Sequence, residues 1–165
     1  MSKKKDRYAS VSSLQWARSA IWLLFLAPVF FISYGFANQY AAAHDISTSL
    51  YFEWERHIPL IPWTIVPYWS IDLLYGLSFL CCRTKQDVDR HGLRLLSAQI
   101  IAVTCFLLFP LRFAFDRPQT EGLWGGLFDA LTSFDKPYNQ APSLHIALLI
   151  LIWAQFTRLK TTYLL

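Results

Sequence analysis

Charged residues are scarce in this sequence. Lys, Arg, Asp and Glu make up 16% of its 165 residues, whereas a soluble globular domain carries about 25%. Hydrophobic residues account for 55% of the chain and aromatic residues for 17%. This composition argues against an ordinary water-soluble domain.

Cysteine is also rare. The three cysteines are Cys81, Cys82 and Cys105, and all lie in or at the ends of apolar segments. Adjacent residues such as Cys81 and Cys82 are poorly placed to form a disulfide with each other, and no spacing typical of a metal site occurs. We therefore expect three packing residues and no metal centre.

Long apolar runs, in contrast, are abundant. In hydrocarbon a spanning segment must satisfy its own backbone, so such runs must be helices of about 20 residues. The pattern predicts an all-α integral membrane bundle of about four transmembrane helices. The membrane domain is expected over residues 19–165, with helices at 19–38, 58–82, 92–115 and 141–157 and external loops at 39–57 and 116–140. The fourth run is short, and we expect Arg158 and Lys160 to reach the interface from its end.

The basic residues gather in three places and give a net charge of +4. Five of the 15 lysines and arginines lie within residues 1–18, four follow the second predicted helix, and two end the fourth. An excess of Lys and Arg marks the cytoplasmic side of a membrane protein. Residues 1–18 are therefore predicted to form a cytoplasmic basic tail with the lipid bilayer as neighbour, and no nucleic-acid partner is expected.

Two polar residues stand out between the first and last helices. Asp72 lies within the second predicted helix, where a carboxylate is costly and suggests a functional hypothesis. The interpretation we favour is a structural role inside the bundle, through a hydrogen bond with a neighbour such as Ser70 or Tyr75. His91 falls in the predicted cytoplasmic loop 83–91 and is expected to be a solvated histidine.

Polar residues also gather at the outer boundary of the third and fourth predicted helices. Residues 112–118 read Arg-Phe-Ala-Phe-Asp-Arg-Pro and mark the exit of the third helix. Residues 139–145 read Asn-Gln-Ala-Pro-Ser-Leu-His and mark the entry of the fourth. Both clusters lie at the same depth, so they can form one site if the two helices are neighbours.

The entry of the fourth helix has the features of a phosphate cradle. Pro142 suits the first turn of a helix, because its missing N–H would be unpaired there. The following N–H groups point outward, Ser143 adds a hydroxyl, and His145 adds an imidazole that exchanges a proton near neutral pH. Arg117 and, about a turn deeper, Arg112 supply guanidinium groups suited to phosphate oxygens. Each feature alone also has a structural explanation, but their shared side and depth favour a phosphate site.

The pair Arg117-Pro118 followed by Pro142-Ser143-Leu144-His145 resembles the first two motifs of the phosphatidic acid phosphatase type 2 superfamily. The phrase from Tyr138 to His145 is most similar to its inositolphosphotransferase-like branch. It is especially similar to bacterial membrane domains that precede a dual-specificity phosphatase domain. The resemblance is close over residues 109–153 and loose over the rest of the chain.

This resemblance implies a lipid-phosphate phosphatase or phosphotransferase that works through a phosphohistidine, with no metal or other cofactor. Arg117 and Arg112 would bind the phosphate of a membrane lipid, and Ser143 would donate a hydrogen bond to it. His145 would be the catalytic general acid toward the leaving group. The protein would be a multi-pass protein of a bacterial inner membrane, with its site facing outward.

The sequence departs from the family pattern in two ways. The Lys that stands seven positions before the Arg of the first motif is replaced by Pro110. The third motif, whose His is the nucleophile, has no counterpart, since His44 and His57 lack its Ser-Arg and Asp context. We therefore expect an incomplete six-helix bundle, either a chain missing its C-terminal segment or one completed by a partner chain. The alternative is a non-catalytic four-helix membrane protein that binds lipid phosphates or partner subunits.

Overall fold

The computed structural model describes residues 13–44, 46–115 and 120–163. The five helices in these residues are α1 (Ser13–Ala43), α2 (Ile65–Ser78), α3 (Lys85–Leu108), α4 (Gly122–Phe134) and α5 (Leu144–Tyr163). Short 3-10 turns occur at η2 (Glu53–His57), η3 (Pro62–Thr64) and η4 (Phe79–Cys81). No β-strand occurs within the described ranges, which confirms the expected all-α class.

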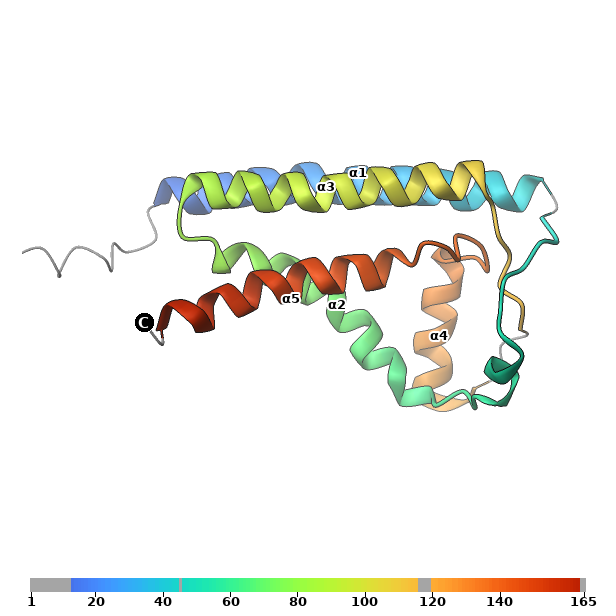
Figure 1. The fold of residues 1–165 in the computed structure, drawn as a ribbon. Coiled ribbons are helices and arrows are strands. Elements are labelled where there is room, and N and C mark those ends of the chain that lie inside the picture. Colours follow the sequence, from blue (N-terminus) through green and yellow to red (C-terminus); the bar gives the residue numbers. More distant parts are fainter. Residues whose placement is uncertain (1–12, 45, 116–119, 164–165) are drawn as a thin grey trace, which may run out of the picture.

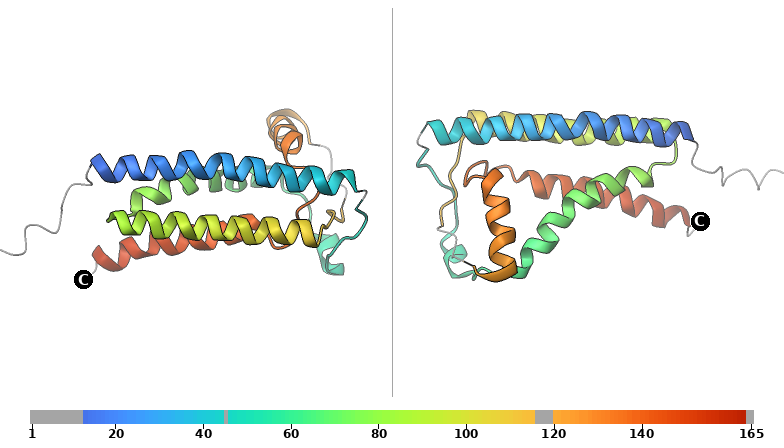
Figure 2. Two further views of the ribbon diagram at one scale, coloured as in Figure 1. Left: turned by 90° about the horizontal axis from the view of Figure 1, so that it is seen from above. Right: turned by 180° about the vertical axis from the view of Figure 1, so that it is seen from behind.

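The long helices lie along one direction and have two distinct ends. α1 and α3 lie side by side and run the same way, whereas α2 and α5 run back toward the start of α1 (Figure 1 and Figure 2). α4 crosses this direction (Figure 1). The start of α1, the turn before α3 and the end of α5 therefore share one end, called here the inner end. The starts of α2 and α5 and the connections around α4 lie at the opposite, outer end.

Close packing of α1 on α3 depends on small residues. A Cβ atom added to Gly92 would lie 2.4 Å from Cδ2 of Trp22, so only glycine lets the indole sit against the α3 backbone. Ala37 and Ala102 lie in the same core and are almost fully buried. Small side chains at such positions let two apolar helices approach each other closely.

Polar groups also link α1 to α3. Asp89 accepts hydrogen bonds from Nε and Nη2 of Arg18, both at 2.6 Å, and from Nε1 of Trp22 at 3.0 Å. Deeper in the pair, the Gln99 amide donates to Oγ of Ser33 at 2.9 Å. Neighbouring helices that satisfy each other's polar groups in this way need no water between them.

Three of the helices are long and apolar enough to cross a membrane. These spans are Gln15–Ala43, Pro62–Cys81 and Lys85–Leu108, and a shorter apolar helix covers Leu144–Arg158. Large hydrophobic side chains on the helix faces that point away from the bundle core are exposed, including Leu24 at 75% and Trp153 at 69%. A surface of this kind suits contact with lipid better than contact with water.

The helix boundaries differ from the expected ones where proline or a helix cap intervenes. The second predicted helix, 58–82, begins as α2 only at Ile65, because Pro59 and Pro62 lack the N–H group that a helix interior needs. The third, 92–115, begins at Lys85, because Thr84 and Asp87 form a capping box.

The outer connections differ in two further ways. The predicted helix 92–115 ends at Leu108, two residues before Pro110, so its last two predicted turns are not helical. The predicted external loop 116–140 contains a complete helix, α4. The described residues therefore include one helix, α4, more than the four that were predicted, in a segment where a loop was expected.

His91 is not a solvated loop residue. It lies inside α3, its side chain is 1% exposed, and its Nε2 is 2.7 Å from Oγ of Ser78. The Phe79 ring packs edge-on against the imidazole, with ring centres 4.9 Å apart. The earlier start of α3 explains the error, because it turns His91 into the bundle.

Candidate functional site

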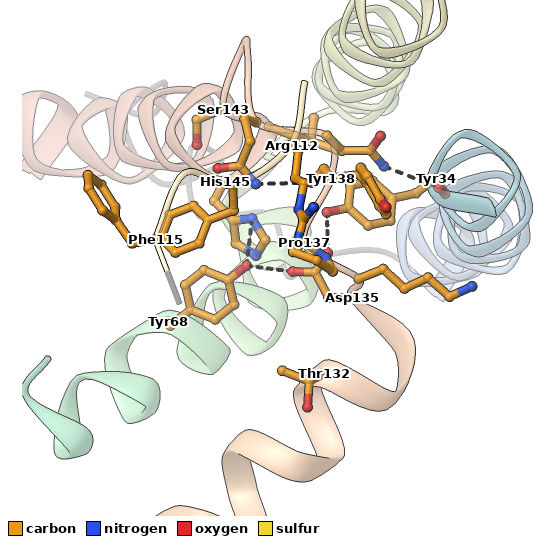
Figure 3. Close-up of a pocket in the computed structure, with 15 residues that line it drawn as sticks. Tyr34, Tyr68, Arg112, Phe115, Thr132, Asp135, Pro137, Tyr138, Ser143 and His145 are labelled. Atoms are coloured by element: carbon orange, nitrogen blue, oxygen red, sulfur yellow. Dashed lines mark hydrogen bonds between the residues drawn. The ribbon is translucent and has the colours of Figure 1, made fainter. Parts of the chain in front are cut away.

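A cavity of about 410 Å³ lies at the outer end, where α5 begins (Figure 3). Arg112, Ser143 and His145 all line it, so the structure brings together three of the four predicted site residues. The fourth, Arg117, lies outside the described residues. The remaining lining residues come from α1, α2, α4 and α5, from the segment after α3 and from the segment between α4 and α5.

Backbone hydrogen bonds join the two polar clusters that the sequence placed far apart. The N–H of Phe113 donates to the carbonyl of Pro137 at 2.8 Å, and Arg112 forms an isolated antiparallel bridge with Tyr138. The Arg112 N–H also donates to the carbonyl of Thr48 at 2.8 Å. The exit of α3 is thus fixed against the approach to α5.

The guanidinium of Arg112 differs from those of Arg18 and Arg56. Within the described residues it has no hydrogen-bonding or ion-pair partner. Arg18, in contrast, pairs with Asp89. The hydroxyl of Tyr51 and the carboxylate of Glu53 hold Arg56 and raise the pKa of that guanidinium above its ordinary value. Arg112 therefore has the donors that a phosphate group would need.

Ser143 occupies the cap position of α5. The helix begins at Leu144, so Pro142 precedes it and does not form its first turn as expected. Oγ of Ser143 accepts a hydrogen bond from the N–H of Ile146 at 3.4 Å, and its carbonyl accepts from Ala147. A capping hydroxyl still carries its own proton, which it can donate to a ligand in the cavity.

Asn139 adds an acceptor to the cavity. Its backbone has φ of +62°, a conformation that asparagine tolerates better than most residues. Its amide donates to the carbonyl of Tyr34 at 3.5 Å, while its Oδ1 has no partner within the described residues. Because the side chain is 93% buried, this oxygen is a site where a bound hydroxyl or ammonium group would gain a hydrogen bond.

His145 is half-buried and is held by Tyr68 from α2. Its Nδ1 is 3.3 Å from the Tyr68 hydroxyl, and the two rings stack with centres 4.1 Å apart at an angle of 25° (Figure 3). The stacking fixes the plane of the imidazole. Tyr68 is a residue that the sequence argument did not single out.

Asp135, directly after α4, was also missed. Its carboxylate accepts hydrogen bonds from the hydroxyls of Tyr34 at 2.6 Å and Tyr68 at 3.3 Å, and from the Asn38 amide at 3.3 Å. Tyr34 and Asn38 are four residues apart in α1, so they lie on one face of an otherwise apolar helix. That spacing was the available signal, because polar residues within an apolar run face protein partners.

A second cavity of about 270 Å³ lies next to the first and is mostly apolar. Tyr34, Tyr68, Asp135 and His145 line both cavities and form the wall between them. Asp72 lines the apolar cavity, and its side chain is exposed. It makes no hydrogen bond to Ser70 or Tyr75 within the described residues, where Ser70 instead donates to the carbonyl of Pro67.

No metal centre is evident from the side chains. Within the ranges that the structure describes, no three His, Cys, Asp or Glu residues are grouped so that they could hold a metal ion. The charged and polar atoms of the site are suited instead to hydrogen bonding and proton exchange.

Comparison of the chain with family models, with curated proteins and with solved structures finds no match.

Proposed function

We propose that this chain is a multi-pass membrane protein that binds the phosphate head group of a membrane lipid in the cavity at its outer end. Three apolar helices of spanning length and the exposed hydrophobic side chains of α5 support the membrane assignment. Basic residues gather at the inner end, among them Arg90, Arg94 and Arg158, which favours a cytoplasmic position for that end. The cavity would then face the non-cytoplasmic side.

The observation that carries the proposal is that one cavity is lined by His145 and by Arg112, whose guanidinium has no partner among the described residues. A guanidinium in a partly enclosed site favours anions, and a planar fork fits phosphate oxygens. The Ser143 hydroxyl adds a donor at the start of α5, where the helix dipole also favours negative charge. These groups together suit a phosphate ester better than a neutral ligand.

The same groups suit phosphoryl transfer of the kind that the phosphatidic acid phosphatase type 2 resemblance implies. Arg112 would stabilise the phosphate charge, and His145 would donate a proton to the leaving alcohol oxygen. His145 is the one histidine among the described residues that line this cavity. The nucleophile of a phosphohistidine mechanism would therefore have to come from outside this group of residues.

That last observation favours a second candidate, binding of lipid phosphates without turnover. The two candidates share the phosphate site and differ only in chemistry. Phosphate release from phosphatidic acid in detergent micelles distinguishes them, since turnover abolished by His145→Ala supports transfer. Binding without release in the wild-type chain supports the non-catalytic alternative.

The test of the shared phosphate site is the affinity of the detergent-solubilised chain for orthovanadate, a phosphate mimic, followed by vanadium NMR. Loss of one charge-assisted contact costs about 1.5–3 kcal/mol, so Arg112→Gln is expected to weaken binding by about 10-fold to 100-fold. The matched control is Arg94→Gln, an exposed arginine at the inner end, which should leave the affinity unchanged. Equal affinities for the wild-type and Arg112→Gln chains would contradict the proposal.

A further inference from the structure

Asp135, Tyr68 and His145 form a continuous hydrogen-bonded chain. The Tyr68 hydroxyl donates to Oδ2 of Asp135 at 3.3 Å and lies 3.3 Å from Nδ1 of His145 (Figure 3). Oδ1 of Asp135 is held at the same time by Tyr34 and Asn38 of α1. The carboxylate is therefore anchored by neutral donors, and no cation lies within ion-pair distance of it among the described residues.

The chemistry of these groups fixes the direction of the chain. An ionised carboxylate only accepts hydrogen bonds, and a tyrosine has a single O–H to donate. Because the Tyr68 hydroxyl donates its hydrogen bond to Asp135, its oxygen can bond to His145 only by accepting a hydrogen bond from Nδ1. Nδ1 of His145 must then carry the hydrogen. In the neutral ring, Nε2 is left bare.

The inner end provides the opposite case. Oγ of Ser78 donates to the carbonyl of Tyr75 at 2.6 Å, so toward His91 it can only accept. The atom that faces it is Nε2 of His91, at 2.7 Å. The same reasoning therefore gives His91 the tautomer with a protonated Nε2. The hydrogen-bond pattern thus predicts opposite tautomers for the two histidines, and His91 serves as an internal reference.

The position of the Asp135–Tyr68–His145 chain suits a role at the phosphate site. His145 lines both the polar and the apolar cavity; Arg112 and Ser143 line the polar one, and apolar side chains such as Leu148 line the other. The charged groups that line the two cavities are Asp72, Arg112, Asp135 and Lys136. Of these, only Asp135 is joined to the imidazole by hydrogen bonds among the described residues.

We propose that Tyr68 and Asp135 are positioning residues that hold His145 with Nδ1 protonated, so that Nε2 is the nitrogen that exchanges a proton with a bound phosphate ester. The second clause rests on the proposed function, whereas the tautomer does not. When a nucleophile supplied from outside these residues, a water molecule or a second histidine, bonds to phosphorus, the ester P–O bond breaks. Nε2–H of the protonated ring then gives its proton to the leaving alcohol oxygen, and the ring returns to the neutral form. Throughout this step the N–H at Nδ1 keeps donating its hydrogen bond to the Tyr68 oxygen. Asp135 stabilises the positive charge of the ring through the Tyr68 hydroxyl.

The test is the tautomer of His145 in the full chain in detergent, read from nitrogen-15 shifts of labelled histidine at about pH 8, where an ordinary imidazole is neutral. The His145 signal is assigned by its loss in His145→Gln. The wild-type chain should show His145 protonated at Nδ1 and His91 protonated at Nε2. Tyr68→Phe removes one oxygen and keeps the stacked ring, so it should shift His145 toward the tautomer mixture of free imidazole.

Two matched pairs make the test specific. Tyr75→Phe removes the same atom two turns further along α2, from a residue that lines only the apolar cavity, and should leave His145 unchanged. Asp135→Asn should weaken the Nδ1 preference, whereas Asp72→Asn should not. An unchanged His91 signal shows in each variant that the fold is intact.

The outcomes separate this inference from the proposed function, because the spectra are recorded without a phosphate ligand. Nε2 protonation of His145 in the wild-type chain, or an unchanged signal in both Tyr68→Phe and Asp135→Asn, overturns the positioning role. If the tautomer is as stated but Arg112→Gln leaves vanadate binding intact, the phosphate site fails while the tautomer assignment stands.

Discussion

The two ends of this molecule each hold a histidine beside a hydroxyl, yet the two pairs are built differently. At the inner end, His91 and Ser78 are 1% and 0% exposed and lie 2.7 Å apart. At the outer end, His145 and Tyr68 are half-buried, lie 3.3 Å apart and line two cavities. The hydrogen bond of the inner pair is shorter and is buried, whereas that of the outer pair is longer and is accessible from two cavities.

A satisfied hydrogen bond therefore does not distinguish a structural histidine from one that takes part in chemistry. His91 packs against Phe79 and completes the contact of α3 with η4, so its bond contributes to stability. His145 is joined to a carboxylate and faces an arginine without a partner among the described residues. Access and charged neighbours, more than bond length, separate the two roles.

The largest expected effect comes from removing the side chain of each histidine in turn. His91→Ala removes a buried ring and its hydrogen bond, and should lower the free energy of unfolding by about 2–4 kcal/mol. His145→Ala empties a site that already borders two cavities, and should cost less than about 1 kcal/mol. Unfolding by SDS, followed by tryptophan fluorescence in detergent, measures both.

Vanadate affinity supplies the converse readout for the same two variants. The His91→Ala chain should bind vanadate as the wild-type chain does at a temperature where it is folded, and the His145→Ala chain should not. Equal stability losses in the two variants would remove the distinction between a structural inner end and a functional outer end.

A smaller effect is expected from the glycines of the two regions. Gly92→Ala places a methyl group 2.4 Å from the Trp22 ring and should destabilise the α1–α3 contact by about 1–3 kcal/mol. Gly76 lies in α2, and a Cβ added to it would meet nothing within 4 Å. Gly76→Ala should therefore stabilise the chain by about 0.5–1 kcal/mol through its helix preference.

The same SDS unfolding assay measures this glycine pair, and both variants add one methyl group to a helix interior. Opposite signs are the expected result. A destabilisation of equal size in the two would show that α2 is as tightly packed as the α1–α3 pair.

Much of the fold could be predicted from the sequence, because apolar periodicity and charge placement act locally. The long apolar runs around Leu24, Leu73 and Ile101 predicted the helices. The basic clusters predicted which segments lie together at the inner end. The boundaries were less well predicted where a cap or a proline competes with the apolar pattern. His91 shows the consequence, since an earlier helix start turned an expected surface residue into a core residue.

The candidate site was predicted only in part, for a physical reason. Arg112, Ser143 and His145 belong to short motifs with an evident chemistry, and the structure places all three around one cavity. Tyr68 and Asp135 have no such signal, because each depends on contacts with helices far away in the sequence. Contacts between residues far apart in the sequence follow from helix packing, and the local spacing of residues does not predict them.

The smallest perturbation tests which end of the molecule is accessible to water. Ser143→Cys replaces one oxygen by sulfur at a residue that lines the outer cavity. Cys81 and Cys82 are native probes of the inner end and are 8% and 3% exposed. In a Cys105→Ala background, a charged, membrane-impermeant thiosulfonate should label Ser143→Cys to about one group per chain and leave the native inner cysteines unlabelled, because only an accessible thiolate reacts.

The same labelling reports the orientation when the reagent is added to intact cells. Modification of Ser143→Cys without permeabilisation supports an outward-facing cavity, as the basic inner end implies. Modification only after permeabilisation would reverse the orientation and leave the site geometry standing. Absence of labelling in detergent, where both ends meet the reagent, would mean that the outer cavity is as closed as the surroundings of Cys82, and the contrast between the two histidines would lose its basis in access.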